Sequence, residues 1–413
     1  MQGISARGPR GLPPFADREP QSKVVIGLGY GDEGKGMAVA RETLRALAHG
    51  LRVFNVRFNG GPQAAHNVRV MGSGDTVLHH THSQFGSGAM FGALTVLTSG
   101  MLVDPLAIAS EASHLSMLTE RDVMKSLVID CKCPVILPMH VEANHAIERK
   151  QRHGSTGRGV GVARAYEADV KACKVDASLL PTVGSLFNPS ELYEGMRALR
   201  SWIWERYEVP VEDVDFDDAR VLSIGMRRLV GHGLGVFDDI DITLRQLLED
   251  DERNCVIFEG SQGVMLDERF GYFPHVTYGD MSAAGAFRAA GRILPVMGVT
   301  RTYHTRHGNG PLKSEGSVSI PEHDNVMNEW AGAFRTGLLM TDELNHASSC
   351  VPVSEVAVSC VDKYPGKYLD WDGNEVSADI RGLFNEVESM CSAPVTVFGC
   401  GNLVQGWHDR KGN

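Results

Sequence analysis

Short apolar runs alternate with amphipathic stretches along most of this chain. The run VVIGLG (24–29) ends in glycines. A helical pattern that stops at Gly50 follows it, and then an alternating run over 51–61. A strand, a glycine-rich turn, a helix and a second strand make up the βαβ unit of a parallel sheet. Further apolar runs predict strands at 126–138, 255–260, 293–304, 355–362 and 393–401.

Helical patterns separate these runs, and they predict helices at 105–118, 140–152, 191–207, 242–252 and 378–391. The alternation indicates an α/β fold, with a P-loop-type, mostly parallel central β-sheet flanked by helices. Loop-rich insertions are expected near 59–90, 152–174 and 305–345. Folds of this class bind ligands in the loops at the carboxyl ends of the parallel strands.

Composition and charge exclude several classes of protein. The chain is 43% hydrophobic and 22% charged over 413 residues, which suits a globular protein with a sizeable core. A net charge of −11 disfavours a nucleic-acid partner, and no apolar run is long enough to span a membrane. We expect a flexible leader over 1–22 and a single domain over 23–413. The eight scattered cysteines predict free thiols and a cytoplasmic location.

The glycine loop GYGDEGKG (29–36) predicts a phosphate-binding site. Gly29-x4-Gly34-Lys35 matches the first part of the P-loop pattern between a strand and a helix. Loop N–H groups, the helix N-terminus and Lys35 all attract phosphate there. Gly36 stands where a P-loop hydrolase carries Ser or Thr for Mg²⁺, so Asp32 is the candidate to hold the metal instead. A glycine-rich turn without a ligand is the alternative.

Several motifs, which occur in the family's order, resemble those of the adenylosuccinate synthetase family. They are GDEGKG (31–36), RFNGGPQAAHNV (57–68), TVLTSGMLVDPLAI (95–108), CPVILPMHVEANHAIE (133–148), GSTGRGVGVARAYEADV (154–170), VIFEGSQGVMLDERFGYFPHVT (256–277) and HTRHGNGPL (304–312). The resemblance implies a C–N ligase in which GTP phosphorylates the 6-oxygen of a 6-oxopurine nucleotide, IMP. The amine of aspartate then displaces the phosphate and gives adenylosuccinate. A homodimer is also implied.

The resemblance assigns catalytic roles to residues of the first two motifs. Asp32 would take the N1 proton of the purine, and His66 would donate a hydrogen bond or proton to its 6-oxygen. Lys35 would stabilise the transferring phosphoryl group. Asp32 and the carbonyl of Ala65 would hold Mg²⁺. A loop histidine without a role is the alternative for His66.

Two nucleotide sites are implied as well. The phosphate donor would contact Gly31, Glu33, Gly34, Gly36, Asn67 and Asp362. The purine monophosphate would contact Gln63, Thr156, Arg158, Gln262 and Thr277. A strand-end threonine is the alternative for Thr277, and a purely structural arginine is the alternative for Arg158.

Two segments depart from the family's pattern. The amino-acid loop EWAGAFRTGLL (329–339) keeps little of an arginine-rich block, so aspartate recognition is expected at Arg335, Thr336 and Arg306. In SCVD (359–362), Asp362 remains to read guanine, but Cys360 replaces a lysine. ATP or dATP is therefore the alternative donor to GTP, and another amine is the alternative to aspartate.

The loop carboxylate also bears on the purine. A phage branch of the family makes diaminopurine precursors from dGMP, and there a small residue replaces this carboxylate. The presence of Asp32 therefore favours IMP over dGMP or GMP. Two hypotheses from other functional classes are alternatives to a ligase. One is a catalytically silent nucleotide-binding regulator, and the other is a P-loop kinase or GTPase. The histidines of LHHTHSQ (78–84) are expected to be solvated loop residues, because no acid-rich spacing supports a metal site.

Overall fold

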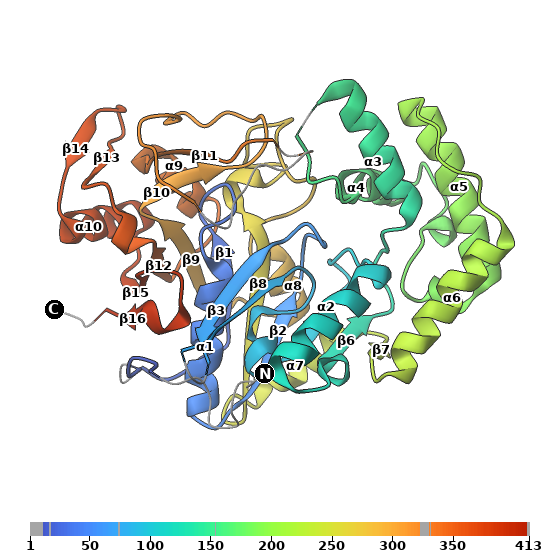
Figure 1. Ribbon diagram of the computed structural model, residues 1–413, viewed down its shortest axis with the longest axis horizontal. Coiled ribbons are helices and arrows are strands. Elements are labelled where there is room, and N and C mark those ends of the chain that lie inside the picture. Colours follow the sequence, from blue (N-terminus) through green and yellow to red (C-terminus); the bar gives the residue numbers. More distant parts are fainter. Residues whose placement is uncertain are drawn as a thin grey trace.

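The computed structural model describes residues 11–15, 18–72, 75–152, 154–322, 330 and 332–410. Within them a ten-stranded sheet forms the centre of the molecule (Figure 1). Its order is β16 (Trp407–Asp409), β15 (Val395–Gly399), β12 (Glu355–Ser359), β9 (Val296–Arg301), β1 (Lys23–Gly27), β8 (Asn254–Gly263), β2 (Arg52–Arg57), β5 (Leu94–Leu97), β6 (Leu127–Asp130) and β7 (Gly235–Phe237).

Neighbouring strands of this sheet pair in parallel, except that β16 is antiparallel to β15. The predicted α/β class and mostly parallel sheet are confirmed. Three small antiparallel pairs stand outside it: β3 (His66–Met71) with β4 (Val77–His82), β10 (Tyr303–Arg306) with β11 (Arg335–Leu338), and β13 (Lys367–Leu369) with β14 (Glu375–Ser377).

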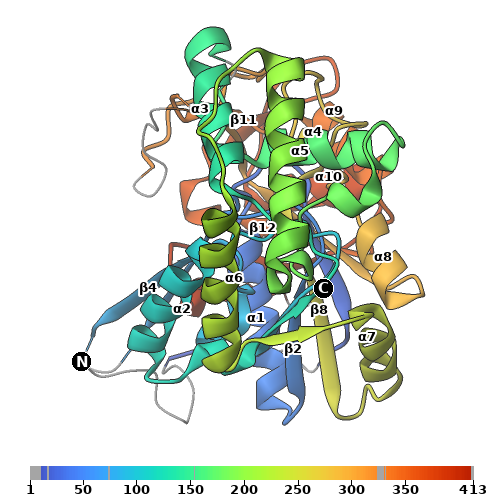
Figure 2. The same ribbon diagram turned by 90° about the vertical axis from the view of Figure 1, so that its right-hand side faces the viewer.

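Helices cover both faces of the sheet, as its apolar strands require. They are α1 (Lys35–Ala48), α2 (Pro105–Thr119), α3 (Pro138–Gln151), α4 (Val160–Lys171), α5 (Pro189–Tyr207), α6 (Phe216–Gly231), α7 (Ile240–Glu249), α8 (Ala284–Ala290), α9 (Thr341–Ser349) and α10 (Ile380–Cys391). Val24 and Ile26 of β1 pack into the core under α7 to α10, whereas Val25 packs with α1 on the other face. Figure 2 shows α1 and β4 on one side and α7 and α8 on the other.

The structure differs from the sequence expectation in the predicted insertions. The region 59–90 holds the β3–β4 hairpin, and 152–174 holds α4. The hairpin's inward positions are partly histidines, which hide its alternation, and the glycines of GRGVGV hide the start of α4. The run 126–138 forms a strand only as far as Asp130, because the prolines at 134 and 138 interrupt it and the second opens α3.

The described part of the predicted leader lies against α1. Phe15 packs in the core beside this helix, and the centre of its ring lies 4.0 Å from the guanidinium carbon of Arg41. The hydroxyl of Ser22 accepts a hydrogen bond from the backbone N–H of Val256. Residues 1–10, 16 and 17 lie outside the described part. Among the helices described, none has the length and apolar character needed to cross a membrane.

A buried ion-pair network fixes the start of β1 between α1 and β12. Nζ of Lys23 lies 2.8 Å from Oε2 of Glu42 and 2.6 Å from Oε1 of Glu355. Arg18 joins the same two carboxylates from the less buried side. Burial opposes ionisation of Glu42, but Lys23, Arg45 and Arg18 outweigh it and lower its pKa to about 2.

Replacing Lys23 tests this network. Because Lys23→Met leaves buried carboxylates without their main partner, it should lower the free energy of unfolding at pH 7 by ~3–5 kcal/mol in urea titrations. Glu42 has a depressed pKa, so its contribution in the wild type is present above about 4.5 and is lost as the pH falls toward 2. The stability difference between the two proteins should therefore shrink below about pH 4.5. A difference that stays constant with pH would contradict this account.

Candidate active site

The loop between β1 and α1 is built around a buried carboxylate. Oε1 of Glu33 accepts hydrogen bonds from the backbone N–H groups of Gly29 and Gly31, at 3.1 and 2.7 Å. Its Oε2 lies 2.6 Å from Nζ of Lys35. Burial opposes ionisation of Glu33, but Lys35 and the N–H groups outweigh it and lower its pKa. An ionised Glu33 therefore holds the loop from within.

Asp32, the neighbour of Glu33, faces away from this internal anchor. Its φ of 61° lies in the left-handed region, which is uncommon for residues other than glycine. Nε of Arg301 donates a hydrogen bond to its backbone oxygen, and its carboxylate lies 3.5 Å from Nε2 of His307. The residue lines two cavities at once. Of the two adjacent acids, Glu33 therefore stabilises the loop and Asp32 faces the cavities.

The first cavity, of about 370 Å³, lies at the N-terminus of α1. The predicted catalytic residues Asp32, Lys35 and His66 all line it. Of the residues predicted to contact a phosphate donor, it is lined by Gly34, Gly36, Asn67 and Asp362. Gly31 and Glu33 are not among its described lining residues, because their groups are engaged inside the loop.

The second cavity, of about 490 Å³, lies between the loop and the segment that leads into α4. All the residues predicted to contact a purine monophosphate line it: Gln63, Thr156, Arg158, Gln262 and Thr277. Asp32, Ala65 and Gln262 line both cavities. A ligand in one cavity would therefore meet a ligand in the other beside the Asp32 carboxylate.

His66, at the start of β3, is held from both ring nitrogens. Nδ1 lies 2.5 Å from Oε1 of Glu259, and Nε2 lies 3.0 Å from the backbone oxygen of Ser261. Burial lowers the pKa of His66, and the hydrogen bond to Glu259 opposes that shift. The backbone N–H and the hydroxyl of Ser87 both donate to Glu259. Both neighbours of the ring are acceptors, so they favour a proton on each nitrogen, whereas burial favours the neutral ring.

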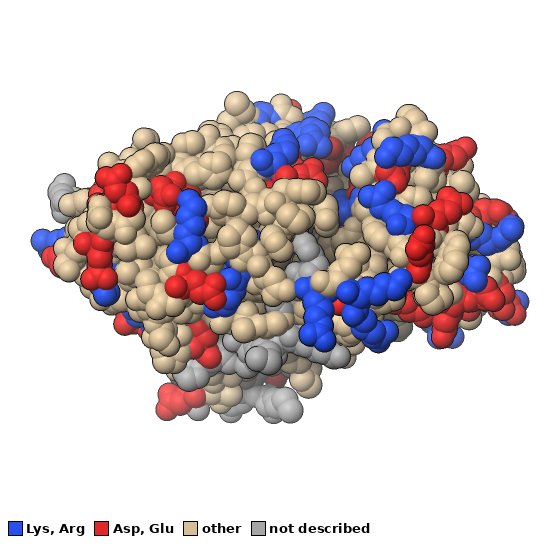
Figure 3. Space-filling view, turned by 90° about the horizontal axis from the view of Figure 1, so that it is seen from above, with Lys and Arg blue, Asp and Glu red and all other residues tan. Residues whose placement is uncertain are grey.

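Lys and Arg side chains gather near the middle of the face that carries the carboxyl ends of the strands (Figure 3). The right-hand end of that face, over α5 and α6, bears many acidic side chains. A chain with an overall charge of −11 thus still offers local positive charge to an anionic ligand near its centre.

A family model described as adenylosuccinate synthetase matches residues 24–363, which include both cavities. The chain belongs to the adenylosuccinate synthetase family. It is therefore a ligase of the adenylosuccinate synthetase type, a class that forms C–N bonds. The suspected family membership is confirmed.

Known relatives agree with this assignment, and a solved structure shares the fold. The adenylosuccinate synthetase of Pseudoalteromonas atlantica is 31% identical over 323 residues, which are 75% of this chain and 68% of that protein. Across such relatives the match spans about two thirds of their length. The fully ligated adenylosuccinate synthetase of Plasmodium falciparum has the same fold, with a TM-score of 0.73 and 18% identity over 95% of this chain and 100% of that one.

A second solved structure shares the fold. It is the cyanophage S-2L succinoaminodeoxyadenylate synthetase, bound to dGMP and to dATP as an energy donor. Its TM-score is 0.63, with 19% identity over 95% of this chain and 96% of that one.

Some side chains of this adenylosuccinate synthetase-family site were missed from the sequence. Glu259 lies within a quoted motif, but only the structure shows that it orients His66. Its one sequence signal is a charged residue at the end of the apolar run CVIF. Arg301 and Glu322 line the first cavity as an ion pair at 2.8 Å, and Trp407 closes it from β16. These residues come from parts of the chain far apart in sequence.

The arginines expected to bind the amino acid, Arg306 and Arg335, donate hydrogen bonds to backbone carbonyls of the protein. Arg306 lines the second cavity, but its terminal nitrogens donate to the carbonyls of Pro311 and His275. Arg335 and Thr336 lie on β11 and are not among the described lining residues of either cavity. Most of the preceding segment, 323–329 and 331, lies outside the described residues.

Gly36 shows why this loop has no Ser or Thr after its lysine. A Cβ at this position would lie 2.8 Å from Cβ of His66 and 3.0 Å from the hydroxyl oxygen of Ser87. Such separations are closer than side-chain packing allows, so β3 must move away if any side chain is added. The glycine permits the close approach that places His66 over the first turn of α1.

Gly36→Ala should displace His66 and lower kcat/KM for ligation by ~100-fold, because small misplacements of reacting groups are that costly. Circular dichroism and thermal melting would check that the variant remains folded. Gly225→Ala, in α6, is the matched control, since an added Cβ there has no neighbour within 4 Å. It should leave kcat/KM unchanged. A fully active Gly36→Ala enzyme would show that His66 does not need this contact.

Proposed function

We propose that this chain catalyses the ligation of IMP and aspartate to adenylosuccinate, with GTP as the phosphate donor. The position of Asp32 in the wall of both cavities carries the proposal. Two nucleotides bound in these cavities would meet at one carboxylate. That arrangement suits direct transfer of a phosphoryl group from one nucleotide to the other.

The first step would join the 6-oxygen of IMP to the γ-phosphorus of GTP. As that bond forms, the N1 proton passes to Asp32, the bond between γ-phosphorus and the bridging oxygen breaks, and GDP leaves. In the second step the aspartate amine attacks C6, phosphate leaves, and the amine loses a proton. His66 would exchange the contact of its Nε2 with the carbonyl of Ser261 for a hydrogen bond to the 6-oxygen in both steps, while Glu259 holds Nδ1.

The first cavity has the features required of a donor site. Lys35, which Glu33 holds at the start of α1, would contact the transferring phosphoryl group. Asp362 lines the cavity, and its Oδ1 accepts a hydrogen bond from the N–H of Gly401 at 2.7 Å. Its other oxygen would accept from N1 and N2 of guanine, which supports GTP ahead of ATP or dATP.

The residues at the junction fit Mg²⁺. Asp32 offers a carboxylate and Ala65 a backbone carbonyl where the two cavities meet, and hard oxygen ligands suit this ion. When bound there, Mg²⁺ would neutralise charge that develops on the transferring phosphoryl group.

The second cavity is proposed to hold the purine monophosphate. Thr156 and Arg158 would contact the phosphate, and Gln63 and Gln262 the base or ribose. Thr277, which lines the same cavity, would also contact the nucleotide. We favour IMP over dGMP because Asp32, in the wall of this cavity, would take the space of a 2-amino group. The phage enzyme with bound dGMP shares the fold, which makes dGMP the alternative substrate to test.

Aspartate remains the proposed amine. Of the residues predicted to bind it, Arg306 lines the second cavity and would be its contact there. The cytoplasmic location is supported by the cysteines, which are all free thiols in the described residues. We also propose a homodimer, in which Lys171, Lys174 or Arg164 would stand in for an arginine that this family lends to the neighbouring subunit. Light scattering of the purified protein tests this point.

A matrix of purified-enzyme assays tests the reaction. IMP, dIMP, GMP and dGMP would be combined with GTP, ATP or dATP, with and without aspartate, and phosphate release and product would be measured. We expect phosphate release at a high rate only with IMP, GTP and aspartate together. Faster turnover of dGMP would assign the alternative substrate. Nucleotide binding with no turnover in any combination would identify a silent regulator instead.

Asp32→Asn isolates the proton acceptor. Because asparagine cannot take the N1 proton, kcat should fall by ~10²–10⁴-fold. Asp75→Asn is the matched control, since Asp75 is an exposed aspartate with a φ of 59°, close to that of Asp32. It removes the same charge from the same backbone conformation outside both cavities, so kcat should not change. Retention of full activity by Asp32→Asn would remove the acid from the mechanism.

A further inference from the structure

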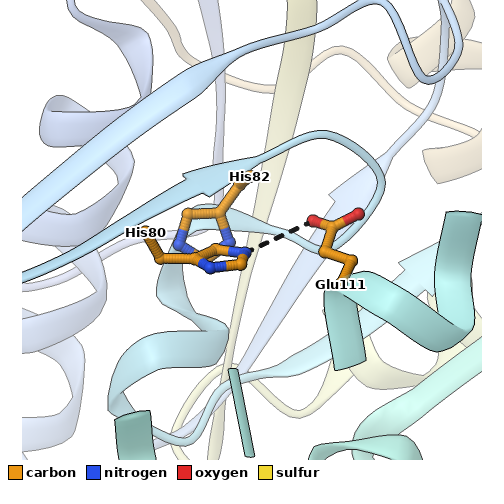
Figure 4. Close-up of side chains that lie close together, drawn as sticks. All are labelled: His80, His82 and Glu111. Carbon is orange, nitrogen blue, oxygen red and sulfur yellow. Dashed lines mark ion pairs between the residues drawn. The ribbon is translucent and has the colours of Figure 1, made fainter. Parts of the chain in front are cut away.

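Three buried side chains meet beneath the β3–β4 hairpin, apart from both cavities. His80 and His82 come from β4, and Glu111 comes from α2 (Figure 4). One ligand atom from each lies within 4.8 Å of the other two. The side chains of His80, His82 and Glu111 are 3%, 0% and 7% exposed. The expectation that these histidines are solvated loop residues is therefore wrong for His80 and His82.

The ring nitrogens of this cluster lack partners. Neither Nδ1 nor Nε2 of His82 has a hydrogen bond among the described residues, although the side chain is fully buried. Nε2 of His80 likewise has no hydrogen bond and lies 3.7 Å from Oε1 of Glu111. Buried polar atoms are normally satisfied, so three such nitrogens in one place indicate a group that they bind.

The surroundings prepare these atoms as ligands. Glu111 accepts hydrogen bonds from the backbone N–H groups of Ser83, Gln84 and Phe85, which fix the position of its carboxylate. Nδ1 of His80 lies 2.7 Å from Nδ1 of His114. If Nδ1 of His80 donates there, Nε2 keeps its lone pair and faces Glu111. A hydrogen bond of this kind is the usual support of a metal-bound imidazole.

An imidazole that binds a metal must be neutral, and the full burial of His82 without a hydrogen-bond partner among the described residues favours the neutral ring. The guanidinium of Arg57 is a buried positive charge close to the cluster. It interacts electrostatically with both Glu111 and Glu259. It donates to the carbonyls of Ser83 and Phe85. Its charge is therefore shared between two carboxylates.

We propose that His80, His82 and Glu111 form a binding site for a divalent transition metal ion, with Zn²⁺ as the best fit. Two imidazoles and a carboxylate are typical zinc ligands, at about 2.0–2.2 Å from the ion. The three ligand atoms would draw together by about an ångström to reach such distances. A water molecule would complete the tetrahedron.

The site is placed for a structural role. Thr81 of β4 and Ser83, which follows the strand, line the second cavity, whereas His80 and His82 face the interior. A metal ion there would be shielded from substrate by the strand itself. His82 is the direct partner of His66 in the β3–β4 register. The ion would thus clamp the hairpin that carries His66 to α2, independently of which nucleotides the enzyme uses.

Metal titration of the untagged, full-length protein tests the site. After dialysis against a chelator, the protein would be titrated with Zn²⁺ in competition with a chromophoric chelator, with excess Mg²⁺ present to fill oxygen-rich sites. We expect one Zn²⁺ per chain and a higher melting temperature when Zn²⁺ is bound. Co²⁺ in its place should give the intense visible absorption of a tetrahedral ion.

Variants then locate the ion. His82→Gln and Glu111→Gln should each weaken Zn²⁺ binding by more than ~100-fold, and His114→Gln by ~10–100-fold. His79→Gln is the matched control, because His79 lies on the same strand but on its opposite face. It should bind Zn²⁺ like the wild type. Circular dichroism of each metal-free variant would check its fold.

Two results would overturn the proposal. The first is a wild-type protein that takes up no Zn²⁺ and gives no tetrahedral Co²⁺ spectrum, which needs no variant to interpret. The second is binding that His82→Gln and Glu111→Gln leave intact, or that His79→Gln weakens as much as they do. Binding at the nucleotide site or at a cysteine would appear as the second result.

Discussion

The ion pair between Glu33 and Lys35 inside the β1–α1 loop is the interaction on which the site depends. A phosphate loop normally offers its N–H groups and lysine to an outside anion. Here a carboxylate of the loop itself accepts from Gly29 and Gly31 and pairs with Lys35. Space for it comes from two glycines, since a Cβ at Gly27 or Gly263 would lie 2.2 or 2.3 Å from its atoms. The loop is thereby shaped before any ligand arrives, and such preorganisation lowers the cost of binding.

This internal anchor sets the direction of Asp32. With Glu33 turned inward, the preceding residue takes a left-handed conformation, and Arg301 holds its backbone oxygen. Its carboxylate then lies in the wall between the cavities. On the other side of Lys35, Gly36 allows His66 to approach the first turn of α1. Three successive features of one loop thus position an acid, a cation and a histidine around the same point.

Much of this arrangement was predictable from sequence because it is local. The strand, loop and helix over 23–48 follow from apolar runs and glycines. The residues proposed for the second nucleotide lie far apart in sequence, and it was their resemblance to the family's motifs that assigned them to one site. The predictions failed where the contact depends on the direction of a side chain or on a partner distant in sequence. Glu33 was assigned to the donor nucleotide, because nothing in the string DEGK tells which acid turns inward. Glu259 and Glu111 approach their histidines only after β8 and α2 have packed against the hairpin.

The central claim is that Asp32 joins two nucleotide cavities, so that phosphate crosses between nucleotides before an amine reacts. It is tested most directly by incubating the enzyme with IMP, Mg²⁺ and GTP that carries a heavy oxygen isotope between its β- and γ-phosphorus atoms, without aspartate. If the transfer is reversible, rotation of the β-phosphate of GDP moves the label out of the bridge. The account predicts scrambling that requires IMP and is lost in Asp32→Asn. A label that stays in the bridge, or that scrambles equally without IMP, would contradict it.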